Sequence, residues 1–180
     1  MRRLSIVTIF LCLICAMAVS AQAQMQMPKP GPELKKLDYF VGTWNMSGTS
    51  NASPMGPAGK WSGTETLKWM EGGFFLTSHS NFKSDNMGNG MGVAYMGYDP
   101  NEKMYTYDEF NSMGEANHSK GMVDGDNWTW TAEQKMNGQM MKERFSMKVE
   151  SATSYTMKFE MSQDGTTWNT IMEGKATKTK

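Results

Sequence analysis

The side chains best suited to acid–base or metal chemistry in this sequence are two histidines. Imidazole can serve as a general acid or base, or as a metal ligand, and His79 and His118 are the histidines of the chain. His79 shares an alternating phase with Thr77 and Asn81, whereas His118 lies in the polar stretch 117–120. Both settings favour an ordinary strand or surface histidine over a catalytic one.

The carboxylates cluster around two expected hairpins. Asp108, Glu109 and Glu115 surround the first, and Asp124 and Asp126 lie in the second. The segment that starts at Asp124 lacks the glycine and glutamate of a calcium-binding EF loop, so turn formation explains these aspartates better. The sequence also contains no G-x-S-x-G elbow, H-E-x-x-H pair or Walker loop. We therefore assign no catalytic residue, and the pattern favours a binding protein over an enzyme.

Methionine is the other unusual source of ligands. Thioethers favour Cu(I), and the candidate clusters are Met25 with Met27, Met87 with Met91, and Met140 with Met141. The remaining methionines are scattered over most of the expected strands, which favours packing in the core or lumen. Copper handling and sacrificial oxidation remain open as alternatives, and we assign no metal site.

The N-terminal segment is typical of a secretory signal peptide. Arg2 and Arg3 precede an uncharged apolar run over residues 4–19, and residues 21–23 form an A-x-A cleavage site. Cleavage after residue 23 would place the mature protein in the periplasm or outside the cell.

Cleavage would also remove both cysteines, Cys12 and Cys15, so the mature chain would contain no thiol or disulfide. Residues 24–180 carry 16 basic and 18 acidic residues, a formal charge of −2. This balance excludes nucleic acid as the default partner, and no second apolar run predicts a membrane span after cleavage. The oligomeric state is left open.

The composition predicts an unusual core. Residues 24–180 contain one Ile, four Leu and four Val, against 18 Met and 19 aromatic residues. So few branched aliphatic residues are typical of disorder, but the small net charge and the alternating apolar pattern argue against that interpretation. The core must therefore be built from Met, Trp, Tyr and Phe.

The elements that would position these side chains are short alternating runs. In the clearest two, the inward face consists of Tyr155, Met157, Phe159 and Met161, and of Phe145, Met147 and Val149. Further runs are expected near residues 43–50, 59–70, 73–83, 90–98, 103–111, 115–123, 127–135 and 167–178, with Gly, Asp and Asn turns between them.

About ten strands at this spacing, without a second long helix, predict an all-β fold. We expect a single antiparallel up-and-down barrel, because only closure removes all sheet edges. A short helix from Pro32 to Phe40 would cap one end. Residues 24–33, which contain three prolines, would form a flexible arm, and residues 34–180 would form the barrel domain.

The segment that leads into the first strand resembles a known group of barrels. A short helix followed by Gly-x-Trp, here Gly42 and Trp44, is similar to the opening of calycin-type barrels such as lipocalins, fatty-acid-binding proteins and the nitrobindin group. A longer pattern over residues 34–178 resembles the bacterial family called domain of unknown function 1579, and it consists of residues 69–76, residues 96–100, Lys103, Tyr105 and residues 172–174.

The resemblance implies an exported calycin-like barrel, with Trp44 as a structural anchor across the closed end and Gly42 in the turn before it. No activity is established for the family. Nitrobindin-like barrels bind haem through a histidine late in the chain, and this sequence has none after His118. That mode of haem binding is therefore not supported, and we assign no cofactor.

The expected barrel and its aromatic and methionine content together predict a lumen that binds a small apolar or amphipathic ligand. The expected wall residues are Trp69, Tyr95, Tyr105 and Tyr107, and His79 is the expected polar contact. Two alternatives remain open. One is an enzyme in the same lumen with His79 as acid or base, and the other is a methionine-based copper or oxidation-related protein.

Overall fold

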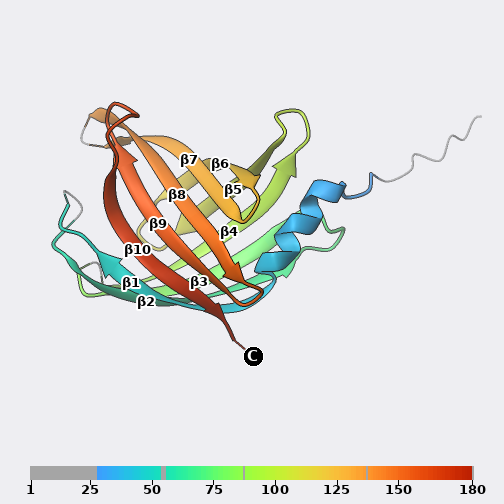
Figure 1. The fold of residues 1–180 in the computed structure, drawn as a ribbon, viewed down its shortest axis with the longest axis horizontal. Helices are drawn as coiled ribbons and strands as arrows, with labels where there is room; N and C mark the ends of the chain where they lie inside the picture. The colour runs from blue at the N-terminus through green and yellow to red at the C-terminus, as the bar shows by residue number, and fades with distance from the viewer. Residues whose placement is uncertain (1–27, 54–55, 87, 137, 180) are drawn as a thin grey trace, which may run out of the picture.

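The computed structural model describes residues 28–53, 56–86, 88–136 and 138–179. These residues form one short 3-10 helix and ten antiparallel strands that close into a barrel (Figure 1), so the predicted all-β barrel with an N-terminal cap is confirmed. In chain order the elements are η2 (Pro32–Phe40), β1 (Gly42–Ser50), β2 (Gly59–Trp69), β3 (Leu76–Ser84), β4 (Gly88–Asp99), β5 (Met104–Asn111), β6 (Ala116–Asp124), β7 (Asn127–Met136), β8 (Gln139–Ser151), β9 (Ser154–Ser162) and β10 (Asn169–Lys178). The predicted signal peptide over residues 1–23 lies outside the described residues.

Each strand pairs with the next one along the chain, and β1 pairs with β10 to close the sheet. Short connections of this kind join antiparallel neighbours. At the closing seam, Trp44 lies opposite Lys178 and Gly48 lies opposite Gly174. Closure leaves no strand of the sheet without a partner on either side.

The start of β3 differs from the sequence prediction. The run predicted over residues 73–83 is instead a strand over Leu76–Ser84. Gly72 and Gly73 have φ angles of 91° and 73°, which no regular strand contains, and the Gly73 N–H donates a hydrogen bond to the Met70 carbonyl at 3.0 Å. These two glycines therefore form a turn before the strand begins.

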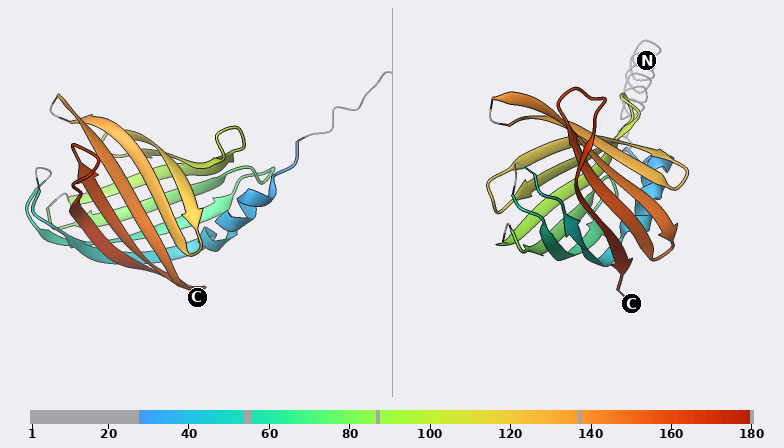
Figure 2. Two further views of the ribbon diagram at one scale, coloured as in Figure 1. Left: turned by 45° about the horizontal axis from the view of Figure 1, so that its top comes forward. Right: turned by 60° about the vertical axis from the view of Figure 1, so that its left-hand side comes forward.

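The helix η2 covers one end of the barrel (Figure 2). Its apolar residues Leu34, Leu37 and Phe40 recur every three positions and are all buried. Because a 3-10 helix has three residues per turn, this spacing places all three side chains on one face. That face packs into the barrel and seals it.

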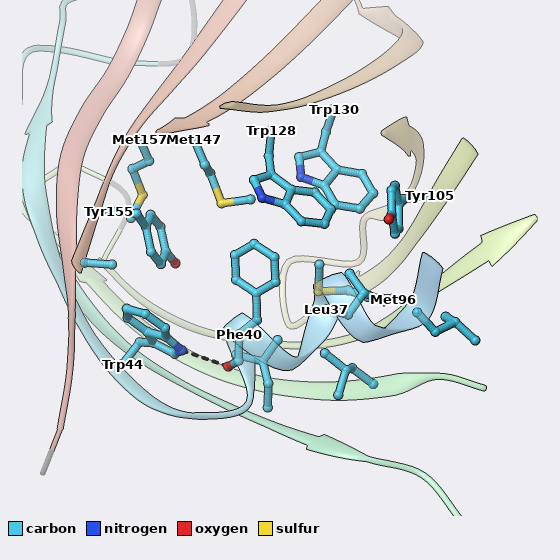
Figure 3. Close-up of a cluster of buried hydrophobic side chains, with 14 of the residues drawn as sticks. Leu37, Phe40, Trp44, Met96, Tyr105, Trp128, Trp130, Met147, Tyr155 and Met157 are labelled. Carbon is cyan, nitrogen blue, oxygen red and sulfur yellow. Dashed lines mark hydrogen bonds between the residues drawn. The ribbon is translucent and has the colours of Figure 1, made fainter. Parts of the chain in front are cut away.

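Gly42 and Trp44 connect this cap to the first strand. Gly42 has a φ of 125°, a conformation that favours glycine, and so allows the chain to turn from η2 into β1. Trp44 is fully buried, and its Nε1 donates a hydrogen bond to the Phe40 carbonyl at 2.8 Å (Figure 3). Trp44 is therefore buried at the closed end of the barrel.

An aromatic cluster fills the lumen beneath η2 (Figure 3). Trp128 and Trp130 stack with their rings 14° from parallel, while Phe40 and Tyr105 contact Trp128 edge-on at centroid distances of 5.1 and 4.9 Å. Gly121 of β6 pairs with Trp130 of β7. The Trp130 indole occupies the space that a side chain at position 121 would need. The closed end is therefore a packed aromatic core, as the shortage of branched aliphatic residues predicts.

The strand phase predicted for β8 and β9 is confirmed. Phe145 pairs with Phe159 and Met147 pairs with Met157, and all four share the inward face. Met147 and Met157 are buried, whereas Phe145 and Phe159 keep partial solvent exposure. The two phenylalanines lie farther from η2 than the two methionines, which indicates that water reaches the lumen from the other end.

Candidate functional site

The interior of the barrel has two unlike halves. Beneath η2, Leu37, Trp44 and Leu76 have no measurable solvent exposure. We call the part of the lumen remote from η2 the open half, and its inward side chains, each partly exposed to solvent, include Met46, Phe82, Phe145, Phe159 and Met172. Solvent therefore reaches this part of the lumen, and an apolar wall of this kind is the usual lining of a small-molecule site.

Two carboxylates on different strands face the lumen where the packed end meets the open half, and we call them the inner acidic pair: Glu65 on β2, opposite Trp44 of β1, and Glu109 on β5. The Ser78 hydroxyl donates a hydrogen bond to Glu65 Oε1 at 2.5 Å. A Cβ on Gly92 would lie 2.7 Å from Ser80 Oγ and 2.9 Å from Glu109 Oε1. The missing side chain at Gly92 therefore leaves the room that the Glu109 carboxyl occupies.

Burial controls the electrostatics of the pair. Removal from water raises the pKa of Glu65, opposed by the weaker effect of the Ser78 hydrogen bond. Burial, followed by the charges of Glu65 and Glu115, raises the pKa of Glu109. The charge of Glu65 therefore acts on the Glu109 carboxyl. Tyr107, on the same face of β5, has its pKa raised well above the ordinary value by burial and then by both glutamates, so its hydroxyl remains a neutral donor.

A third inward carboxylate, Glu143 on β8, accepts a hydrogen bond from Gln134 Nε2. Burial raises the pKa of Glu143 as well. In the part of the chain that the structure describes, the strand register directs no lysine or arginine into the open half. The inward Lys178 lies at the closed end, where its Nζ donates to the Tyr39 carbonyl at 3.0 Å. The open half therefore contains an excess of acidic groups.

Of the five residues expected to contact ligand, three face inward. Tyr105 is buried in the aromatic cluster, and its hydroxyl donates to the Glu33 carbonyl at 3.0 Å. Trp69 lies at the capped end, where its Nε1 donates to Asp38 Oδ1 at 2.8 Å. Both therefore hold η2 against the barrel. Tyr107 alone borders the inner acidic pair.

His79 and Tyr95 lie on the outer face, which corrects the lumen position expected for both. The inward residues of β3 and β4 are those in phase with Leu76 and Met96, and His79 and Tyr95 are one residue out of that phase and exposed. Ligand binding by any of the five residues stays a prediction.

The second histidine is also outside the barrel. His118 is exposed on β6, with its Nδ1 2.6 Å from Asp108 Oδ1. Neither histidine faces the lumen. His79 is therefore not placed to act as acid or base in a lumen enzyme. Among the described residues, no three His, Cys, Asp or Glu side chains gather as a metal site.

The methionines that could bind copper do not converge where they are described. Met91 and Met140 are exposed, while Met25, Met27 and Met87 lie outside the described residues. Cu(I) binding therefore stays a prediction, and the positions of the described methionines add no support for it.

Two grooves mark the outer wall. One, of about 900 Å³, crosses β10, β1, β2, β3 and β4 and includes Lys83 and Lys175, and the other, of about 650 Å³, lies over β7 to β10 and β1. Both are wide depressions of the outer face, without a buried carboxylate. The lumen contains the carboxyls whose pKa is raised by burial, so we take it as the candidate site.

One member of the inner acidic pair, which is absent from the site residues expected above, nevertheless has a signal in the sequence. On β2, Glu65 alternates in phase with Trp61, Leu67 and Trp69. A carboxylate on an otherwise apolar phase breaks the binary pattern of a strand. Such a conflict is expected at functional sites, and it singles out Glu65 without a structure.

Replacing Glu65 with glutamine is expected to raise the melting temperature at neutral pH and to change it little near pH 4. Glutamine keeps the shape and still accepts the Ser78 hydrogen bond. Burial raises the pKa of Glu65 in the folded protein above its value in the unfolded chain. The wild-type protein therefore loses stability as the pH rises from the unfolded-state pKa of Glu65 to its folded-state pKa. Thermal melts of the wild type and Glu65→Gln across this range test the prediction.

Glu173→Gln, at an exposed position on β10, is the control, and its melting temperature should track that of the wild type at every pH. A Glu65→Gln variant that is less stable at neutral pH would show that the ionised carboxylate stabilises the fold.

Comparison with solved structures finds the same fold in a distant protein. The crystal structure of Rv2717c from M. tuberculosis matches with a TM-score of 0.59 at 12% identity, covering 84% of this chain and all of that one. A structure of EF1p2_mFAP2b bound to DFHBI matches with a TM-score of 0.43 at 9% identity, over 81% of this chain and 98% of that chain. At these identities the likeness to Rv2717c concerns the fold alone.

No curated protein matches the sequence. A family model, described as "Protein of unknown function (DUF1579)", matches residues 29–178, which include η2 and all ten strands. This chain therefore belongs to the DUF1579 family.

Proposed function

We propose that this protein binds a small amphipathic molecule in the open half of its barrel. The observation that carries the proposal is the partial exposure of inward aromatic and methionine side chains around the inner acidic pair. An apolar wall with a few placed polar groups is the usual composition of a small-molecule site.

The two ends of the barrel have different parts in this function. The end beneath η2 is sealed by Leu37, Phe40 and Trp44, so the ligand enters from the opposite end. There the wall contains Met46 and Met172, whose flexible side chains can adapt to a guest. The packed end supplies rigidity and the open half supplies the contact surface.

We also propose that the protein acts after export, on the basis of the signal-peptide pattern of residues 1–23. Within the described part of the chain, none of the helical structure has the length and apolar character needed to cross a bilayer.

Titration with an uncharged naphthalene fluorophore tests the binding proposal. Protein that begins at Gln24 is expected to give a saturable rise in fluorescence with a Kd of about 10 μM or tighter. The inward Ala132 on β7 allows the lumen to be filled by mutation. We expect Ala132→Trp to weaken binding by about tenfold or more, since each factor of ten corresponds to about 1.4 kcal/mol.

Thr131→Trp, which adds the same side chain one residue earlier on the exposed outer face, is the matched control and should bind as the wild type does. Absence of saturable binding by folded wild-type protein, or equal losses in the two tryptophan variants, would contradict a site in the lumen. The melting temperature of each variant verifies that it is folded.

A further inference from the structure

We propose that the ligand of the open half carries a basic nitrogen, and that Glu65 and Glu109 hold it in its protonated form. This inference rests on the proposed function and specifies its ligand class. It starts from the charges that face the lumen: Glu65, Glu109 and Glu143 point inward, and the nearest inward cation, Lys178, is at the closed end with its Nζ 5.0 Å from the centre of the Trp44 ring.

The inner acidic pair has unused capacity to accept hydrogen bonds. Glu65 receives one bond, from the uncharged Ser78 hydroxyl, whereas an ionised carboxylate can accept about four. Within the described residues, no hydrogen bond or ion pair joins Glu109 to another side chain. The outer face shows the contrast, because Glu160 there is bound by both Arg144, at 2.8 Å, and Lys158, at 2.7 Å.

Glu65 and Glu109 lie on strands that are not neighbours, and the charge of Glu65 acts on the Glu109 carboxyl. In register, Glu65 pairs with Ser80 and Ser80 with Gly92. The Glu109 carboxyl lies over Gly92, beside Ser80 Oγ. A protonated amine bound above Gly92 can therefore contact both carboxylates and a hydroxyl, which matches its three donor hydrogens.

A separate observation also indicates a ligand in this lumen. Trp61 faces inward from β2 with 8% of its surface exposed, and among the described residues its Nε1 is the buried side-chain polar atom that lacks a hydrogen-bond partner. Its ring lies against Gly48 and Gly174, on the same face of β2 as Glu65 and about 13 Å farther along the strand. A buried donor without a partner is costly, and an acceptor on a bound molecule would satisfy it.

The same charges disfavour the opposite ligand class. A carboxylate guest, such as a fatty acid, would place its negative charge beside the inner acidic pair without a counter-ion from the described residues. Like charges in a poorly solvated site repel strongly. The apolar wall would accept the chain of either guest, so the head group decides between them.

Competition with three matched amphiphiles tests this inference. The uncharged naphthalene probe is bound first and then displaced by dodecylamine, dodecanol or dodecanoate, each below its micelle-forming concentration. We expect dodecylamine to displace the probe at about a tenfold lower concentration than dodecanoate, a ratio equivalent to about 1.4 kcal/mol, with dodecanol between them.

In the Glu65→Gln/Glu109→Gln variant the preference for the amine should disappear, while the probe itself still binds. Glu133→Gln, at an exposed position on β7, removes one negative charge from the outer face and should keep the full preference. If the double variant does not fold, Glu65→Gln alone should still reduce the preference at least about threefold, since the Coulomb attraction of one of two carboxylates is lost.

The outcomes separate this inference from the binding proposal. Probe binding without an amine preference, or a preference that survives loss of both inner glutamates, would overturn the basic-nitrogen inference and leave the lumen site intact. An equal loss of preference in Glu133→Gln would assign the effect to net charge and would also overturn it. Failure of folded protein to bind the probe would contradict the lumen site itself.

Discussion

Replacing Trp44 with alanine is expected to destabilise the folded protein by about 3–5 kcal/mol, in the range for buried aromatic residues. Trp44 is completely buried, its ring centroid lies 4.9 Å from that of Tyr155, and its Nε1 bonds the Phe40 carbonyl. Truncation would remove the packing and also leave that carbonyl without its partner. Equilibrium denaturation of the two proteins measures the difference.

Trp44→Phe separates the two contributions. Phenylalanine keeps most of the aromatic contact but loses the N–H, so we expect a cost of about 1–3 kcal/mol from the unpaired carbonyl and the smaller ring. Probe binding in the open half should change little in this variant. An unchanged melting temperature of Trp44→Ala, combined with loss of probe binding, would show that Trp44 belongs to the ligand site and not to the anchor.

Most of the fold could be predicted from the sequence because two local signals agree along the chain. Alternating apolar residues give the strands, as in Tyr155, Met157 and Phe159, and glycine-rich or aspartate-rich turns separate them. When all connections are short, neighbouring strands must pair in sequence order. Only the β1–β10 pair, which closes the barrel, has no local signal.

The positions of the site residues were harder to predict, because alternation does not reveal which phase faces inward when both phases are apolar. On β4, Met91, Val93 and Tyr95 face outward, while Ala94 and Met96 face inward. The pairing of β3 with β4 decides between the phases. The residue type of Tyr95 predicts a lumen position, but the strand phase places it on the outer face.

The inner acidic pair was overlooked for a different reason. In the sequence, Glu109 stands beside Asp108 in a hairpin rich in carboxylates. Asp108 points outward and is solvated, whereas Glu109 points inward. The two adjacent carboxylates have opposite environments, and only the strand phase distinguishes them. A buried carboxylate without a cation partner lowers stability, so its presence in the open half is better explained by ligand binding than by folding.

Replacing Gly48 with valine is expected to destabilise the barrel by at least about 3 kcal/mol, the upper range for an overpacked site. Gly48 faces Gly174 across the seam between β1 and β10. A Cβ on Gly48 would overlap the Glu173 carbonyl oxygen and lie 2.7 Å from both Gly174 Cα and Trp61 Cζ2. Because two of these three atoms belong to the backbone, the clash must be relieved by separating the two strands.

The matched control is Ser47→Val, one residue earlier on the exposed face of the same strand. A β-branched residue is favourable at such a position, so we expect a change within about 0.5 kcal/mol. Separation of the seam would also expose two strand edges, and the Gly48→Val protein should therefore associate at concentrations where Ser47→Val stays dispersed. Denaturation midpoints and size-exclusion profiles measure both effects. Equal stability of the two variants would show that closure of the barrel does not depend on the close approach of Gly48 to Gly174.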